Sequence, residues 1–426
     1  MSAENPTEKS TNGVYQFRCA YPIPSYLFAL AVGDLRCRSL SPRSSVYAEP
    51  AVVSQAAWEL AELEGMIKAA GTLFGPYRWK RCDLIVMPFS FPLGGMENPQ
   101  LVFVTPALLA GDRSLTSLVA HELSHAWSGN MVTNATWEDF WLNEGFSVYA
   151  EHRVMEELYG KEYDDMLAML SFRSLTKAIA VLPARDTWLH LDLGKRHPDD
   201  CFTEIPYEKG YFFLRMIEEN VGRELWDRFV QEYFDTFAFQ SITSSAFLAF
   251  LRERLTGGDV ELDRKLGLED WIYGPGLPKN CPKVRSVQLE QVDAANEQFE
   301  NGSPAAELNT DMWTTHHWLY FLSNLTVPLA REVIEDLNQT FALSKTKNAE
   351  MMYRWLLLCI ASRYECADPA LTAFLLRHGR MKYIRGLYQE LVKTEEGKKQ
   401  AQRIYRLARP RYHSAIVRFV DEMLVA

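Results

Sequence analysis

The chain has 426 residues, 47% of them hydrophobic, and carries a formal net charge of −10 at pH 7. A chain of this length exceeds one typical hydrophobic core, so two or three packed units are expected. The acidic balance and the scarcity of long basic runs argue against nucleic acid as the main partner, because phosphate binding needs clustered Lys and Arg.

The N-terminus and the cysteines indicate where the protein works. The leader MSAENPTEKSTN, residues 1–12, is polar and lacks the apolar segment of a secretory signal. The seven cysteines are scattered without a CxxC pair, which indicates neither a disulfide framework nor a cysteine zinc site. The most apolar early stretch, residues 26–32, is far shorter than the roughly 20 residues that cross a bilayer. We therefore expect a cytoplasmic protein without a membrane span.

Residues 13–273 alternate between strand and helix signals. Short β-rich runs (YQF, YLFALAV and SVYAE) predict strands within residues 13–49. The stretch SQAAWELAELEGMIKAAGTLFG has apolar residues at helical spacing, and CDLIVMPFSF and LVFVT are compact apolar runs typical of buried strands. From about Ser114 onward helical periodicity dominates. Residues 50–273 are therefore predicted to form one mixed α and β unit.

The sequence pattern changes after residue 273. Residues 274–307 contain GPGLPKNCP and NGSPA and are predicted to be an interdomain linker. Beyond it, segments such as AREVIEDLNQTFAL and AEMMYRWLLLCIASRY have the pattern of successive amphipathic helices joined by short turns. Residues 308–426 are therefore expected to form stacked helix pairs, although no strict period names a repeat family.

The segment LTSLVAHELSHAWSG carries the first chemical motif. On a helix, His121 and His125 are offset by only about 40°, so both imidazoles can reach one ion while Glu122 lies beside them. A helix with two packed histidines would produce the same five residues. The motif alone therefore leaves both interpretations open.

Glu144 favours a metal site over two packed histidines. It lies at the start of a second predicted helix, and two His with one Glu are the three-ligand set of a catalytic zinc. Zinc lowers the pKa of a water ligand toward neutrality, so Glu122 could accept its proton and pass it to a leaving amine. Glu151 lies two turns after Glu144, where it either orients a ligand or is a solvated carboxylate.

Two further segments fit this chemistry. The loop GGMEN has two glycines that allow close backbone approach to a ligand, although it could be only a turn. The segment IPYEKG offers Tyr207, whose hydroxyl could donate to an oxyanion, although an isolated tyrosine is more often part of a core.

The motifs GGMENP, HELSHAW, WLNEGF and PYEKG, in this order and spacing, closely resemble the M1 family of zinc aminopeptidases. YPIPSYLFALAVGDL, FVTPALLAGDRSL, WIYGPGLP and HGRMKY resemble its leukotriene-A(4) hydrolase and aminopeptidase B branch. The resemblance implies a mixed α+β fold: a thermolysin-like zinc metallopeptidase catalytic domain, followed by an all-α superhelical domain of armadillo or HEAT type.

The resemblance also implies roles for individual residues. It assigns one Zn²⁺ per chain to His121, His125 and Glu144, the general base to Glu122, and transition-state stabilisation to Tyr207. It assigns the free α-amine of the substrate to Glu97, within a substrate-binding loop of Gly94, Gly95, Met96, Glu97 and Asn98. Arg380 and Lys382 match positions that hold a substrate carboxylate, the alternative being that they are solvated charges.

Two departures from the family pattern affect the interpretation. Family members begin with a large β-rich domain, and residues 13–49 match only its last strands, without its Gln-containing motif for the substrate amine. Asp199 matches an acid linked to epoxide hydrolysis, but Phe202 stands where that branch has tyrosine. We therefore expect a zinc aminopeptidase acting on peptides. The alternatives are hydrolysis of a lipid epoxide at the same site, or a truncated non-catalytic scaffold.

Overall fold

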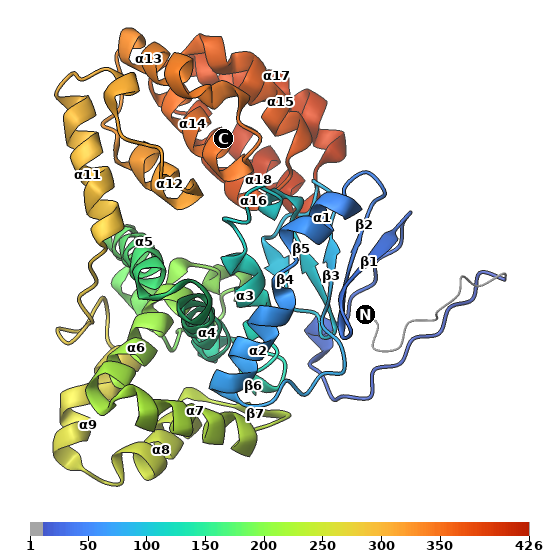
Figure 1. Cartoon of the computed structure of the whole chain (residues 1–426), viewed down its shortest axis with the longest axis vertical. Coiled ribbons are helices and arrows are strands. Elements are labelled where there is room, and N and C mark those ends of the chain that lie inside the picture. The colour runs from blue at the N-terminus through green and yellow to red at the C-terminus, as the bar shows by residue number, and fades with distance from the viewer. Residues whose placement is uncertain (1–11, 426) are drawn as a thin grey trace.

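The computed structural model describes residues 12–425, which build the arrangement in Figure 1. Within these residues one large hydrophobic core runs from Val46 to Ile272 and a second from Leu289 to Val420, with Ala107 and Met166 of the first unit packed into the second. The predicted leader lies outside the described residues, except for Asn12.

A twisted sheet forms one side of the first unit. Among the described residues it has five strands in the order β1-β2-β3-β5-β4: β1 (Arg36–Ser41), β2 (Ser44–Ala48), β3 (Asp83–Val86), β5 (Leu101–Val104) and β4 (Gly95–Met96). β2, β3 and β5 are parallel, and β1 and β4 pair antiparallel at the two edges. Every residue of β3 and β5 is buried, as expected for apolar runs inside a parallel sheet.

The expectation of strands over residues 13–49 is only partly met. SVYAE contains β2, but YQF and YLFALAV are not strands. Phe28, Leu30 and Val32 are 75%, 68% and 87% exposed. Their alternation is typical of a strand, but these residues belong to neither of the two sheets that the structure describes. β1 and β2 instead extend the sheet that contains β3.

Helices cover this sheet and build the rest of the first unit (Figure 1). They are α1 (Val53–Glu59), α2 (Leu63–Phe74), α3 (Ser117–Ser124), α4 (Trp141–Tyr159), α5 (Lys161–Val181), α6 (Gly210–Val221), α7 (Arg223–Thr236), α8 (Ser244–Leu251), α9 (Val260–Leu266) and α10 (Leu268–Tyr273). A short parallel pair, β6 (Val132–Asn134) and β7 (Gln240–Ile242), closes the far end. Helix α4 is central, because it contacts α2, α3, α5 and α6.

Two glycines set the spacing between α4 and α6. A Cβ atom on Gly145 would lie 2.7 Å from the Cα atom of Gly210, and one on Gly210 would lie 2.6 Å from the Cα atom of Gly145. Any side chain at either position would collide with backbone. The wide turn Ile205–Lys209 (η6) directly precedes α6 and is therefore held at a fixed distance from α4.

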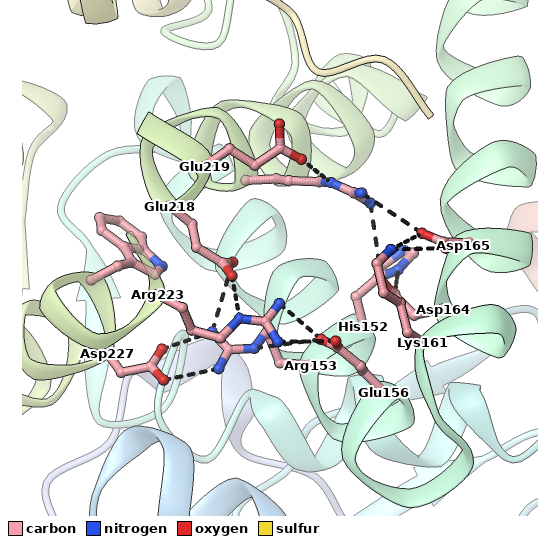
Figure 2. Close-up of polar contacts among 12 residues, drawn as sticks. His152, Arg153, Glu156, Lys161, Asp164, Asp165, Glu218, Glu219, Arg223 and Asp227 are labelled. Atoms are coloured by element: carbon pink, nitrogen blue, oxygen red, sulfur yellow. Dashed lines mark hydrogen bonds and ion pairs between the residues drawn. The ribbon is translucent and has the colours of Figure 1, made fainter. Parts of the chain in front are cut away.

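Ion pairs fix the other side of α4 (Figure 2). Arg153 binds Asp227 of α7 through two hydrogen bonds of 2.7 and 3.0 Å and is only 6% exposed. Arg223 bridges Glu218 at 2.6 Å and Glu156 at 2.9 Å. Two-point guanidinium–carboxylate contacts restrict orientation as well as distance, so α4, α6 and α7 form one rigid block.

The second unit contains only helices among its described residues. They are α11 (Val287–Glu300), α12 (Thr315–Asn324), α13 (Arg331–Phe341), α14 (Ala349–Ala361), α15 (Asp368–Arg377), α16 (Met381–Leu391), α17 (Glu395–Ala408) and α18 (Ser414–Val425). Helix α12 contacts α14, α14 contacts α16, and α16 contacts α18. Helix α15 contacts α17. This alternation produces two stacked helical layers, as the amphipathic segments predict.

The predicted linker is wrong in part, because α11 lies inside residues 274–307. Ser286 caps this helix, and Leu289, Val292 and Phe299 pack into the second core. Their spacing of three to seven residues is helical, but the flanking Pro and Gly residues obscure it.

No helix within residues 12–425 combines the length and apolar character needed to cross a membrane.

We expect Gly145→Ala to lower the free energy of unfolding by about 2–3 kcal/mol, since the added methyl group meets backbone rather than a movable side chain. The matched control is Gly71→Ala in α2, where nothing lies within 4 Å of the new Cβ. Removing a helical glycine there should raise stability by about 0.5–1 kcal/mol. Urea denaturation followed by circular dichroism measures both. Equal stabilities for the two variants would contradict the proposed close contact.

Candidate active site

Two histidines meet at the C-terminal end of α3. His121 lies in its last turn and His125 follows directly after its end, so their Nε2 atoms are 3.2 Å apart. Val119, Ala120 and Leu123 are buried in the core. The helical spacing that the sequence predicts therefore brings the two imidazoles together.

Glu144 reaches the same point from the first turn of α4. Its Oε2 atom lies 3.3 Å from Nε2 of His121 and 3.5 Å from Nε2 of His125. Zinc bonds of about 2.0–2.2 Å with tetrahedral angles separate neighbouring ligand atoms by roughly 3.3–3.6 Å. Oε2 of Glu144 is also buried without a hydrogen-bond partner among the described residues. These three side chains therefore fit a zinc ion.

Further contacts orient both imidazoles. Nδ1 of His125 lies 3.0 Å from the backbone oxygen of Ser128 and 2.9 Å from Oγ of Ser147. Nδ1 of His121 lies 3.3 Å from Oε2 of Glu151, in the position that an orienting carboxylate requires. These contacts leave both Nε2 atoms free to face the ion.

The site is strongly negative without a cation. Burial alone would lower the pKa of His121, but the hydrogen bonds and charges of Glu144 and Glu151 raise it well above its usual value. Burial raises the pKa of Glu122 well above the ordinary glutamate range. The charge of His121 opposes this rise, and the charges of Glu97 and Glu144 add to it. Such a field attracts a divalent cation and favours a carboxyl that can hold a proton.

Glycines in the predicted loop make room for Glu122. A Cβ atom on Gly95 would lie 2.1 Å from Oε1 of Glu122, and one on Gly94 would lie 2.9 Å from Nη2 of Arg380. Carboxylate oxygens of Glu97 and Glu122 and a ring nitrogen of His125 lie within 4.8 Å of one another. The loop thus brings Glu97 to the His125 side of the cluster.

Contacts from distant segments hold Glu97. The hydroxyl of Tyr26 donates to Oε1 of Glu97 at 3.4 Å and accepts from Nδ2 of Asn143 at 3.3 Å. Nδ2 of Asn130 donates to the backbone oxygen of Glu97 at 2.7 Å. Tyr26, Asn130 and Asn143 are residues around the site that no sequence motif indicated. WLNEGF contains Asn143, but no local pattern pairs it with Tyr26.

The other loop residues point elsewhere. Met96 is half-buried and packs against the small apolar cluster of Ile85, Leu101 and Phe103. Asn98 is 1% exposed, and neither atom of its amide has a partner within residues 12–425. The predicted substrate-binding loop therefore brings only part of its side chains to the metal cluster.

Tyr207 lies beside the metal cluster, in η6. Its ring stacks on His121 with centroids 6.2 Å apart. Burial and the surrounding carboxylates raise the pKa of Tyr207 well above 10. It is therefore a neutral hydrogen-bond donor at physiological pH.

Asp199 and Phe202 lie apart from this cluster. The side chain of Asp199 is 66% exposed and pairs with His197 at 3.5 Å. Phe202 is 55% exposed and packs edge-on against Phe140, which in turn contacts Tyr207. Asp199 has no described contact with the three candidate metal ligands.

Arg380 and Lys382 share one carboxylate. Nη1 of Arg380 bonds to Oε1 of Glu350 at 2.7 Å, and Nζ of Lys382 bonds to Oε2 at 2.8 Å. Tyr383 donates to Glu350 as well. Burial would raise the pKa of Glu350, but Lys382 and Arg380 lower it to about 2. The two cations and one anion leave a net positive charge next to Gly94.

This carboxylate predicts a pH effect on stability. The pKa of Glu350 is lower in the folded state than in the unfolded chain. The ionised carboxylate therefore adds its full share to the free energy of unfolding above the unfolded pKa, and this share is lost as pH falls toward 2. Glu350→Gln should cost about 2–3 kcal/mol at pH 7, since the partly buried Arg380 and the half-exposed Lys382 lose the carboxylate that they share. Between pH 6 and pH 3 the difference from wild type should shrink by about 2 kcal/mol.

Urea denaturation at several pH values tests this prediction. The control is Glu261→Gln, which removes an exposed carboxylate paired with Arg264 and should cost under about 1 kcal/mol. A Glu350→Gln deficit that stays constant with pH would contradict the prediction.

Comparison with known proteins identifies the family of this chain. The chain matches the Peptidase family M1 domain over residues 58–266 and the Leukotriene A4 hydrolase, C-terminal domain over residues 313–424. It is 37% identical to leukotriene A-4 hydrolase of Xenopus laevis, covering 98% of this chain and 69% of that protein. Identity to aminopeptidase B of Mus musculus is 35%, covering 100% of this chain and 68% of that protein.

Solved structures agree with the sequence matches. A structure of yeast LTA4 hydrolase in complex with bestatin superposes with a TM-score of 0.91 at 30% identity, covering 98% of this chain and 71% of that one. The chain therefore belongs to peptidase family M1, in the group of leukotriene A4 hydrolase and aminopeptidase B, and is a zinc metallo-aminopeptidase with a thermolysin-like catalytic domain and an all-α C-terminal domain.

Proposed function

We propose that this chain removes N-terminal residues from peptides by zinc-dependent hydrolysis. The observation that carries the proposal is the meeting of His121, His125 and Glu144 with 3.2–3.5 Å between their ligand atoms, next to the buried Glu122. When bound there, zinc would polarise the scissile carbonyl and lower the pKa of the attacking water.

Glu122 serves as the general base. It takes the proton of the attacking water and later gives it to the leaving amine. Burial raises the pKa of Glu122 above the ordinary glutamate range, which makes its carboxylate a stronger proton acceptor than an exposed glutamate. Its position against Gly95 limits the directions in which the carboxylate can turn.

Glu97 binds the free α-amine of the substrate. It is buried, close to Glu122 and His125, and Tyr26 fixes one of its oxygens. A carboxylate held in a closed site attracts an ammonium group and leaves no room for a longer chain, as an exopeptidase requires. Gly94 and Gly95 allow the substrate to approach the loop closely.

Tyr207 stabilises the transition state. Its neutral hydroxyl lies beside the candidate metal ligands, where it can donate to the oxygen that becomes negative during attack. The stacking of its ring on His121 keeps Tyr207 beside these ligands.

The domain division is a proposal of the same kind. We place the catalytic unit at residues 36–273, since β1 and β2 share its sheet, and begin the helical unit at α11. Arg380 of the helical unit then lies beside the loop at Gly94, and Lys382 shares Glu350 with it. Their net positive charge can receive the carboxylate of a peptide.

A lipid epoxide has less support as substrate. Its hydrolysis would require a placed acid and hydroxyl, but Asp199 faces solvent and Phe202 has no hydroxyl. A non-catalytic scaffold has less support as well, because the His121, His125 and Glu144 cluster fits a metal ion and Tyr207 lies beside it.

We expect Glu122→Gln to lower kcat/KM by about 10²–10⁴-fold for fluorogenic alanyl, leucyl and arginyl substrates, since the proton acceptor is lost. Metal analysis should find one zinc per chain in the wild type and in the variant. Zinc-loaded wild-type protein that hydrolyses none of these substrates would overturn the aminopeptidase proposal.

Glu97→Gln should act mainly on substrate binding. Losing a charged partner of the substrate ammonium should lower kcat/KM by about 10–100-fold, chiefly through a higher KM. Steady-state kinetics on the same panel measures this change. An unchanged KM would remove Glu97 from amine recognition.

A further inference from the structure

Lys209 is a fully buried lysine close to the candidate active site. It is 0% exposed and lies two residues after Tyr207, at the end of the wide turn η6. Its Nζ atom donates to the backbone oxygen of Thr187 at 2.8 Å and to that of Gly274 at 2.8 Å. Lysines are almost never fully buried unless they are paired, and the proposed reaction makes no use of this one.

The amine of Lys209 suits two carbonyl oxygens rather than a carboxylate. Burial lowers the pKa of Lys209 to about 7, because a charge is costly in the interior. The neutral amine keeps two N–H donors, and the oxygens of Thr187 and Gly274 accept both. This side chain can therefore link two backbone segments without a buried counter-charge.

The two carbonyl groups belong to a frame that is itself cross-linked. Thr187 ends the short helix η4 (Ala184–Thr187), and Gly274 directly follows α10. The backbone N–H of Gly276 donates to Oγ1 of Thr187 at 2.8 Å, which joins the two segments. Helix α10 in turn packs into the first core. The frame thus offers Lys209 two acceptors at fixed positions.

Helix α4 holds the same turn from another side. Gly210 meets the backbone of Gly145, and the backbone oxygen of Pro206 lies 3.0 Å from the place of a Cβ atom on Gly145. Tyr207 lies within this stretch. Its backbone is therefore fixed by α4 through Pro206 and Gly210, and by η4 and α10 through Lys209.

The task proposed for Tyr207 depends on where its side chain lies. Its ring stacks on His121 with 6.2 Å between the centroids, and its hydroxyl is the donor proposed for the developing oxyanion. Turns as wide as η6 are rare and are frequent at functional sites. A misplacement of about 1 Å can lower a rate by about 10²-fold. The anchors of this turn therefore bear directly on the reaction.

We propose that Lys209 is a positioning residue for Tyr207: its amine bonds η6 to η4 and α10, and so fixes the Tyr207 hydroxyl beside the candidate metal ligands. Lys209 acts through Tyr207 and not on the substrate. This inference rests on the proposed aminopeptidase function and adds a residue to its machinery.

A double-mutant cycle separates this role from general support of the fold. Lys209→Met keeps a long side chain but removes both hydrogen bonds. It should lower kcat on alanyl and leucyl fluorogenic substrates by about 10–100-fold and change KM by less than about twofold. In a Tyr207→Phe background the same change should alter kcat by less than about twofold, because the hydroxyl to be positioned is already absent.

Two further variants complete the cycle. Lys265→Met makes the same substitution at an exposed position of α9 and should leave kcat and KM at their wild-type values. Lys209→Gln keeps an N–H donor at the buried position and should lose less kcat than Lys209→Met. If the methionine variant does not fold, Lys209→Gln takes its place in the cycle.

The position of Tyr207 can also be measured without turnover. In a crystal structure of zinc-loaded Lys209→Met, the Tyr207 ring should have moved from its place on His121, whereas Lys265→Met should keep the centroid distance of 6.2 Å. An unmoved ring in Lys209→Met would overturn the inference, whether or not the wild type hydrolyses peptides.

The outcomes distinguish this inference from the proposed function. Hydrolysis by the wild type, with losses from Lys209→Met and Tyr207→Phe that multiply, would overturn the positioning role and leave the aminopeptidase intact. A displaced ring in a protein that hydrolyses no peptide would support the positioning role and overturn the aminopeptidase alone.

Discussion

Everything at the site depends on one constraint: helix α4 cannot rotate or slide. Glu144, Ser147 and Glu151 lie three and four residues apart and so share one face of the helix. Glu144 meets the two imidazoles, Ser147 touches His125, and Glu151 touches His121. The backbone contact at Gly145 and the ion pairs of Arg153 hold the helix from other sides. A rotation of a few degrees would disturb all of these contacts together.

Local spacing was enough to predict the centre of the site. Two histidines four residues apart on a helix must share a face, and Glu144 on the next long helix completes a familiar ligand set. The buried strands around the loop were predictable for the same reason, since apolar runs of that length belong inside a parallel sheet. In both cases neighbouring residues carry the whole signal.

Features that depend on distant contacts could not be found in this way. Tyr26 reaches Glu97 across 71 positions and Asn143 across 117, so no window of sequence contains the pair. The strand signal in YLFALAV has the right alternation, but a strand also needs a neighbour. Helix α11 was missed for the opposite reason, because Pro and Gly on both sides concealed a short periodic segment.

Glycine at position 95 has a consequence beyond the shape of the loop. The space where its side chain would begin is already filled by a carboxylate oxygen of Glu122. A side chain at position 95 and the carboxylate of Glu122 would therefore occupy the same volume. Only glycine at position 95 leaves Glu122 the space that it occupies in the site. Natural variation at position 95 should thus be almost nil wherever position 122 remains glutamate, and freedom should return only in chains that have lost the chemistry.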